Sequence, residues 1–457
     1  MKPDHRPDEL KQRLEQLKQA GLRQVELQVP DLDGGLRGKI VPLEKGLSAS
    51  GGAFCTILYG LTVGDDVYAS PHSSPENGYP DNIILADPDT LATIPVGERS
   101  LALAICDTIS PDGTLCPLSP RTVLRQALAQ AEPLGFEMRF GFEYEICLTK
   151  ADPEKLAAGA QYDLAPPSFR RNAYSLLRSE EIHQLGLELY DRLAEADIAL
   201  EALHSELGHG MMEIALPPAP ALRAADQAVR TKLLIKRAAH DLGYTASFMA
   251  KWKISESGCG GHIHQSIWRD GAPAFLGADG ALSESGLAYV AGLSKTMPDF
   301  AAIFFPTINS YRRLDAGAWA PENAAWGIDN RSAALRVITG PTPKAARVEH
   351  RAPGADSNPY LALAAMVAGG AHGLREKLDP GAPAQGNASE DTRFAALPRS
   401  LDAAASLFEA SDIARQAFGD QFVDHFALSR REEWRLWQAH LEAHVSQWEL
   451  DRYFTSV

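Results

Sequence analysis

The sequence predicts an α+β protein with a small N-terminal β-rich domain over residues 1–110 and a larger second domain over residues 111–457. The chain of 457 residues exceeds what a single hydrophobic core usually holds, so more than one domain is expected. Up to residue 107, short runs of alternating polarity are separated by turn residues, which is typical of strands. Beyond residue 119, strand-like runs alternate with long helical patterns.

The N-terminal part is expected to begin with a helix and to continue in short strands. Residues 8–20 repeat leucine with helical spacing, and Gly21 is typical of a helix end. The elements expected after this helix are a strand over residues 25–29, a turn over residues 31–35, a second strand over residues 38–42 and a loop over residues 70–80.

The second domain is expected to begin at a helix start. Ser119 suits the N-cap and Pro120 suits the first helical position. The patterns predict helices over residues 120–132, 180–195, 221–242 and 359–374, an exposed loop over residues 378–390 and a charged helical tail over residues 429–454.

Charge and cysteine content exclude several classes of function. Lys and Arg number 44 and Asp and Glu number 59, so the net charge is −15, which disfavours nucleic acid and anionic membranes as partners. The five cysteines are odd in number and form no Cys-x-x-Cys pair, which favours free thiols in a reducing cytoplasm. No signal peptide core is present at the N-terminus, and no run of about 18 apolar residues occurs.

Two segments bring pairs of glutamates close together. In residues 139–146 (RFGFEYEI), Glu143 and Glu145 are two residues apart, so both point to the same face of a strand. Residues 204–214 (HSELGHGMMEI) carry Glu206 and Glu213 on either side of a glycine-bearing turn, which can bring both carboxylates to one point. Adjacent carboxylates repel each other unless a cation lies between them or one takes a proton. Each pair therefore fits either a divalent-metal site or a solvated surface.

A glycine-rich segment carries two histidines. In residues 257–266 (SGCGGHIHQS), His262 and His264 share one strand face, and the glycines before them allow close approach of a ligand to the backbone. Neutral imidazole binds transition metals and Mn²⁺. Two histidines beside a glycine run favour a binding site over a purely structural role.

Arginines are concentrated in three later segments, residues 309–314 (NSYRRL), 329–336 (DNRSAALR) and 343–351 (PKAARVEHR). Guanidinium groups bind phosphate and carboxylate in bidentate fashion. If these arginines lie near the acidic residues, they would hold nucleotide phosphates over metal ions. The alternative is that they form ion pairs along the protein surface. No Walker A sequence is present, so a glycine-rich phosphate loop is not expected.

Taken together and in this order, these segments resemble the glutamine synthetase family, from residue 25 to the tail at residues 448–454 (WELDRYF). The resemblance implies a small β-grasp-like N-terminal domain that completes the neighbouring subunit's site. It also implies a glutamine synthetase-type catalytic domain with an antiparallel sheet flanked by helices. The implied reaction joins the γ-carboxylate of glutamate to an amine through γ-glutamyl phosphate and uses ATP. Two or more Mg²⁺ or Mn²⁺ ions in each site and a homo-oligomer of one or two hexameric rings are implied as well.

The resemblance also implies roles for individual residues. The ligands of the metal near glutamate would be Glu145, Glu206 and Glu213, and those of the metal on the ATP phosphates would be Glu143, His262 and Glu349. The residues that match glutamate and phosphoryl contacts are Arg313, Arg331 and Arg351, and further substrate-binding residues are expected to be Gly258, Met211 and Trp319. Those that match ATP contacts are Arg336, Lys344, Arg347, His264, Ser266 and Glu201. Asp31 matches an aspartate that reaches the neighbouring subunit's site and helps to deprotonate the amine.

One departure from the family's pattern concerns the acceptor. Ammonia-using members carry a glutamate six residues after the arginine that Arg313 matches, and this chain has Trp319 there. That glutamate binds ammonium and takes a proton from it. Tryptophan can do neither, but it can form an apolar wall or stack on an alkylammonium, an attraction of about 0.5–2 kcal/mol. The alternative is that Trp319 only packs within its own loop.

Two further differences add to this departure. Met211-Met212 stands in place of a glutamine and an aromatic residue, and Ser257 stands in place of an asparagine. We therefore expect an organic amine as the acceptor, as in γ-glutamylpolyamine and γ-glutamylmonoamine synthetases. A polyamine, ethanolamine and an aromatic or alkyl monoamine all remain open. The alternatives are an ammonia-using glutamine synthetase and a non-catalytic relative.

Overall fold

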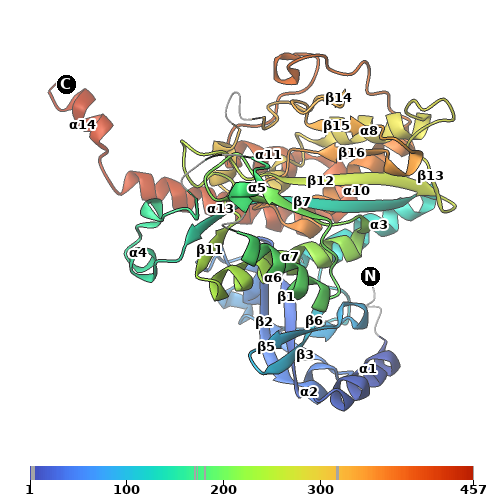
Figure 1. Ribbon diagram of the computed structural model, residues 1–457, viewed down its shortest axis with the longest axis vertical. Helices are drawn as coiled ribbons and strands as arrows, with labels where there is room; N and C mark the ends of the chain where they lie inside the picture. The colour runs from blue at the N-terminus through green and yellow to red at the C-terminus, as the bar shows by residue number, and fades with distance from the viewer. Residues whose placement is uncertain (2–5, 169–170, 172, 180–181, 315–318, 456–457) are drawn as a thin grey trace.

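Two β-sheets organise the chain (Figure 1). The computed structural model describes residues 1, 6–168, 171, 173–179, 182–314 and 319–455. The first sheet has the strand order β2-β1-β6-β4-β3, with β5 paired to β6, and the second has the order β14-β15-β16-β12-β7-β9-β8, with β10 and β11 on β7 and β13 on β12. The predicted α+β class is confirmed. The first sheet ends at Ile109, and the predicted domain division at residue 110 stays a prediction.

The N-terminal sheet is built from short strands around a parallel pair. Its elements are α1 (Pro7–Gln19), β1 (Gln24–Pro30), β2 (Leu36–Pro42), α2 (Leu43–Gly46), β3 (Gly52–Cys55), β4 (Asp81–Ala86), β5 (Ala92–Val96) and β6 (Arg99–Ile109). The pairing of β1 with β6 is parallel, and the remaining pairings in this sheet are antiparallel. The predicted helix and the two predicted strands at the start of the chain are confirmed.

The predicted strand β1 alternates apolar and polar residues, yet it is buried on both faces. Two of its polar side chains, Glu26 and Gln28, contact α7 (Ala221–Asp241). Arg237 donates to Glu26 at 2.8 Å, and Arg230 donates to Gln28 at 3.1 Å. These partners satisfy the polar groups of β1, so the polar face of the strand can be covered. They lie far from β1 along the sequence.

The second sheet is antiparallel except for the parallel pair β14–β15. Its strands are β7 (Glu137–Lys150), β8 (Ala202–Ser205), β9 (Met211–Ala215), β10 (Ala219–Pro220), β11 (Tyr244–Ser247), β12 (Gly261–Arg269), β13 (Ala272–Pro273), β14 (Trp326–Ile328), β15 (Leu335–Ile338) and β16 (Arg347–His350). The other helices are α3 (Pro120–Ala131), α4 (Pro153–Ala157), α5 (Leu176–Ser179), α6 (His183–Glu195), α8 (Glu284–Thr296), α9 (Ala301–Phe304), α10 (Pro359–Glu376), α11 (Leu401–Ala410), α12 (Asp412–Phe418), α13 (Asp420–Glu442) and α14 (Gln447–Tyr453).

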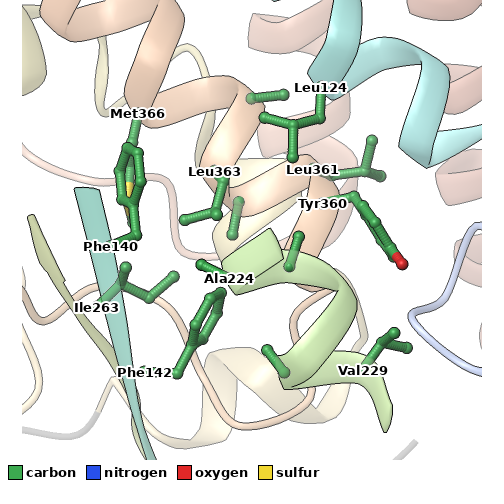
Figure 2. Packing of buried hydrophobic residues seen from close by; sticks show 14 of the residues in the cluster. Leu124, Phe140, Phe142, Ala224, Val229, Ile263, Tyr360, Leu361, Leu363 and Met366 are labelled. Carbon is green, nitrogen blue, oxygen red and sulfur yellow. The ribbon is translucent and has the colours of Figure 1, made fainter. Parts of the chain in front are cut away.

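Helices cover one face of this sheet with apolar side chains. Figure 2 shows Phe140 and Phe142 of β7 and Ile263 of β12 in one cluster with Leu363 and Met366 of α10. Successive strand residues point to opposite faces, so the residues between these apolar ones face away from α10. The opposite face is therefore left for polar side chains, and the predicted glutamates and histidines lie there.

Two predicted helices have different ends in the structure. The helix expected over residues 180–195 begins at His183, and residues 180–181 lie outside the described residues. The expected tail helix over residues 429–454 is two helices, since α13 starts earlier at Asp420 and α14 starts anew at Gln447. Ser446 accepts from the backbone N–H of Glu449 and forms a capping box with it, which favours a fresh helix start.

The predicted start of α3 is confirmed in position. Ser119 occupies the N-cap and Pro120 the first turn, but the Ser119 side chain makes no capping hydrogen bond.

All five cysteines are free thiols. None of the helices in the described part of the chain has both the length and the apolar composition that crossing a bilayer requires.

A buried arginine links the N-terminal sheet to the helices that follow it. Arg121 of α3 is 1% exposed and pairs with Asp87 at 2.7 Å and with Asp226 of α7 at 2.9 Å, and it also contacts Asp107 of β6. Asp226 further accepts a hydrogen bond from the Tyr360 hydroxyl of α10 at 2.7 Å. A buried charge needs such partners, so this network fixes the N-terminal sheet against α3, α7 and α10.

Candidate active site

The register of four adjacent strands brings the predicted acids and histidines together. On β7, Glu145 lies opposite Glu213 of β9, and Glu143 lies opposite His262 of β12. On the next pairing, His264 of β12 lies opposite Glu349 of β16. Because directly opposite residues in neighbouring strands point to the same face, these side chains converge on the face that α10 leaves free.

We call the set Glu143, Glu145, Glu206, Glu213, His262 and Glu349 the Glu/His cluster. Ligand atoms of Glu143, His262 and Glu349 lie within 4.8 Å of one another, and so do those of Glu145, Glu213 and His262. A third group within the same limit joins Glu206 and Glu213 to His204. The cluster is thus continuous, with Glu213 and His262 each shared by two groups.

The electrostatics of the cluster fit divalent cations. Burial raises the pKa of Glu145 to about 7, and the Glu213 and Glu206 carboxylates act in the same direction. Burial, together with Arg351, holds the pKa of His262 well below its usual value, so its imidazole is neutral and can donate a lone pair to a metal. Carboxylate oxygens with a neutral imidazole are suitable ligands for Mg²⁺ or Mn²⁺, and a cation would relieve the repulsion between the carboxylates.

Arginines close one side of the cluster. Arg351 donates to Glu349 at 2.5 Å, and Arg336 donates to the other oxygen of Glu349 at 3.2 Å. Burial alone would raise the pKa of Glu349, but the guanidinium groups of Arg351 and Arg336 hold it below its usual value. Arg347 donates to Nδ1 of His264 at 2.9 Å, and His264 pairs with Glu143 at 2.9 Å. The acids are therefore interleaved with fixed positive charge.

Arg313 is fixed from behind by main-chain oxygens. It follows the 3₁₀ helix Asn309–Arg312, and its guanidinium donates to the carbonyls of Ala352 at 2.8 Å and Arg351 at 3.0 Å. A Cβ at Gly258 would lie 2.9 Å from Cγ of Arg313, so glycine allows this side chain to lie on the backbone. Arg313 is buried, yet it lines the cavity described next.

A single cavity of about 670 Å³ contains most of the predicted site. It is lined by the whole Glu/His cluster and by Met211, Gly258, His264, Arg313, Trp319, Arg331, Arg336, Arg347 and Arg351. Trp319 is 61% exposed, and residues 315–318 before it lie outside the described residues. The structure thus brings metal-ligand, phosphate-binding and acceptor candidates to one place.

Four predicted residues do not line this cavity. Ser266 shares the face of His262 and His264 farther along β12 and accepts from Trp268 Nε1 at 2.9 Å. Glu201 and Lys344 are exposed, the latter in the 3₁₀ helix Pro343–Ala345. Asp31 lines another cavity, between the turn after β1 and the helices α7 and α13, where Arg37 donates to it at 3.0 Å. The roles expected for these four stay predictions.

Sequence reasoning missed several residues of the cavity. Tyr174, Leu207 and Ile338 line it, and His204 bonds Glu213 at 3.0 Å. The ring of Tyr174 lies 4.6 Å from that of His204, centroid to centroid. Tyr174 comes from an irregular segment with no periodic pattern, so no sequence signal marked it. His204 does belong to the segment 204–214, and its place beside the glutamates was a usable signal.

Comparison with known proteins agrees with this geometry. Residues 117–453 match the family described as "Glutamine synthetase, catalytic domain". The chain is 37% identical over 442 residues to a glutamate–isopropylamine ligase of Pseudomonas sp, with 95% of both chains covered. It is 33% identical over 436 residues to the γ-glutamylethanolamide synthetase GlnA4 of Streptomyces coelicolor, with 94% of this chain and 92% of the relative covered. Other relatives of similar identity are named glutamine synthetases.

The fold has close counterparts among solved structures. A GmaS/ADP complex superposes with a TM-score of 0.81 at 24% identity, covering 96% of this chain and 99% of that one. At this identity the likeness shows the fold alone. With the family match over most of the chain, it follows that this protein belongs to the glutamine synthetase family of ATP-dependent ligases that form C–N bonds.

Proposed function

We propose that this enzyme ligates the γ-carboxylate of glutamate to an organic amine, with cleavage of ATP to ADP and phosphate. The observation that carries the proposal is Trp319, which lines the cavity of the Glu/His cluster at the position where ammonia-using members carry a glutamate. An indole cannot take a proton from ammonium, whereas its face attracts an alkylammonium. The relatives named for isopropylamine and for γ-glutamylethanolamide point the same way.

The family uses divalent metals, and the Glu/His cluster is where this chain would hold them. We assign Glu143, His262 and Glu349 to one ion and Glu145, Glu206 and Glu213 to the other. The support is that the first three have ligand atoms within 4.8 Å, and that Glu213 is within the same limit of both Glu145 and Glu206 in separate groups. When bound, such ions neutralise charge on the transferred phosphoryl group.

The arginines then do the positioning that phosphoryl transfer requires. We assign Arg313 and Arg351 to glutamate, Arg331 to the transferred group, and Arg336 and Arg347 to the ATP phosphates. The γ-carboxylate attacks the γ-phosphate and ADP leaves. The amine then loses a proton and attacks the acyl carbon, and phosphate leaves. Fixed cationic donors stabilise the charge that builds up in both steps.

We propose that Asp31 reaches the site of a neighbouring subunit in a homo-oligomer, a hexamer or a pair of hexameric rings. Within one chain it lines a cavity separate from that of the Glu/His cluster. The turn after β1 fixes its carboxylate, which accepts from the backbone N–H of Gly35 at 2.7 Å. A carboxylate brought in this way would take the proton of the amine.

Phosphate release from ATP with glutamate and Mg²⁺ tests the function directly. We expect strong turnover with at least one organic amine in a panel of ammonia, ethanolamine, diamines, polyamines and alkyl or aromatic monoamines. Turnover with ammonia alone would show the second candidate, an ammonia-using glutamine synthetase, which the relatives of that name favour. No turnover with any amine would favour a non-catalytic relative.

Metal binding should depend on pH in a defined direction. The pKa of Glu145 is raised to about 7, so this carboxyl is largely protonated below that pH in the metal-free protein. A metal binds the deprotonated form, so affinity should rise about tenfold per pH unit below pH 7 and level off above it. Titration calorimetry with Mn²⁺ between about pH 6 and about pH 8 measures this.

The Glu145→Gln variant is the control for this pH dependence, because it removes the titrating group while keeping its size. It should bind Mn²⁺ more weakly and should lose the part of the pH dependence that Glu145 causes. Equal Mn²⁺ affinity for the unmodified enzyme at both ends of the range would contradict the assignment of Glu145 as a ligand.

A further inference from the structure

Several apolar and aromatic side chains line the active-site cavity, and three of them are exposed. Tyr174, Leu207 and Trp319 line it, and they are 64%, 50% and 61% exposed. Met211 lines the same cavity and adds a flexible apolar side chain. Large apolar side chains left open at the mouth of a polar site are suited to cover an apolar part of a ligand.

Both aromatic residues have an unusual backbone conformation, and Tyr174 is also held by its neighbours. Tyr174 has φ of 60° and Trp319 has φ of 54°, in the left-handed region that bulky side chains rarely adopt. The backbone N–H of Tyr174 donates to the Ser205 carbonyl at 3.0 Å, and its ring lies 4.6 Å from that of His204. Residues held in this unfavourable conformation concentrate at ligand sites, where the surrounding structure fixes them.

Within one chain, the carboxylates of the cavity are already paired or assigned to metal ions. The carboxylates among its described lining residues all belong to the Glu/His cluster. Glu143 pairs with His264, Glu213 bonds His204, and Glu349 is held by Arg351. Glu145 accepts from the backbone N–H of Gly260 at 2.6 Å, and Glu206 accepts from that of Leu207 at 2.8 Å. The remaining charged lining residues are arginines and histidines. These side chains either repel a cation or offer it no negative charge with which to pair.

We propose that the acceptor is a primary monoamine with a compact apolar substituent, and that Tyr174 and Trp319 select it. This inference rests on the proposed function and narrows it to one class of amine. The amine nitrogen reaches the acyl phosphate beside the Glu/His cluster, while its substituent is covered by Tyr174, Leu207 and Trp319. A diamine or polyamine would place a second ammonium against these apolar side chains or near the arginines, where burial of an unpaired charge is costly.

A matched pair of amines tests the selection. Butylamine and 1,3-diaminopropane have nearly the same length and differ by a terminal methyl or ammonium group. We expect kcat/KM for butylamine to exceed that for the diamine by about 30-fold or more, since an unpaired cation replaces an apolar contact. A diamine equal to or better than butylamine would overturn the inference and leave the organic-amine function standing. Turnover with ammonia alone would overturn the proposed function itself.

Substitutions test the role of Tyr174. Tyr174→Ala should lower kcat/KM for butylamine about tenfold through KM, with KM for ATP unchanged, and Tyr174→Phe should restore it. Tyr162 is a matched control, because it is 61% exposed and does not line the cavity, and Tyr162→Ala should leave the amine preference unchanged. A Tyr174→Ala enzyme that keeps the preference of the unmodified enzyme would show that Tyr174 does not select the amine.

Discussion

Replacing Glu349 by alanine should lower turnover by about a thousandfold or more. Glu349 is 1% exposed, lies within 4.8 Å of the ligand atoms of Glu143 and His262, and receives hydrogen bonds from Arg336 and Arg351. Its loss removes a proposed metal ligand and frees two arginines that the phosphates need in fixed positions. Loss of one fixed electrostatic group at a reacting centre costs about 10²–10³ in rate, and a metal ligand adds to that.

The measurement is kcat for phosphate release, with Mn²⁺ stoichiometry determined by electron paramagnetic resonance. We expect one fewer tightly bound ion in the variant. Glu26→Ala is the matched control, because Glu26 is also a buried glutamate paired with an arginine, Arg237, but lies in the N-terminal sheet. It should lower stability without changing the number of bound ions.

Circular dichroism separates folding from chemistry in both variants. The removal of one partner from a buried ion pair costs about 3–5 kcal/mol, so the melting temperature should fall in Glu349→Ala. It should fall less in Glu26→Ala, because Arg237 is 35% exposed and solvent can stabilise its charge. A folded Glu349→Ala enzyme with unchanged turnover at saturating metal would show that Glu349 is not a ligand. Glu349→Gln, which keeps the size and the acceptor oxygen, should retain more stability than alanine but little more activity.

The sequence predicts which residues share a strand face, but not which strands are neighbours. Glu143 and Glu145, and likewise His262 and His264, are two residues apart, so their common face follows from strand geometry alone. The pairing of Glu145 with Glu213, and of Glu143 with His262, depends on the register between strands. Register is set by contacts distant in sequence, so the residue spacing left each pair open between a metal site and a solvated surface.

Long-range contacts also explain what the residue patterns missed. The polar residues of β1 are covered because α7 brings Arg230 and Arg237 to them. Tyr174 reaches the cavity from an irregular segment, through a main-chain hydrogen bond to Ser205 and a ring contact to His204. These long-range contacts leave no periodic pattern in the sequence. The helices predicted over residues 221–242 and 359–374 do have a periodic pattern, and the structure confirms their ends within two residues.

Replacing Trp319 by glutamate should shift the enzyme from its amine toward ammonia. The substitution removes a cation–π partner worth about 0.5–2 kcal/mol to an alkylammonium, which is up to about 30-fold in kcat/KM. It also restores a carboxylate at the position where ammonia-using members carry one, and a positioned base contributes about 10²–10⁴-fold to proton removal. The ratio of kcat/KM for ammonia to that for the best organic amine should therefore rise by about a thousandfold.

Trp448→Glu is the matched control, because Trp448 is also 61% exposed but lies on α14 and does not line the cavity. In this variant, the ratio of kcat/KM for ammonia to that for the best organic amine should equal the ratio of the unmodified enzyme. The control therefore separates the effect of the site from that of an added surface charge. Trp319→Phe keeps an aromatic face and should keep the amine preference. If Trp319→Glu left the ratio unchanged in a folded enzyme, Trp319 would not contact the acceptor, and the case for an organic amine would lose the observation that carries it.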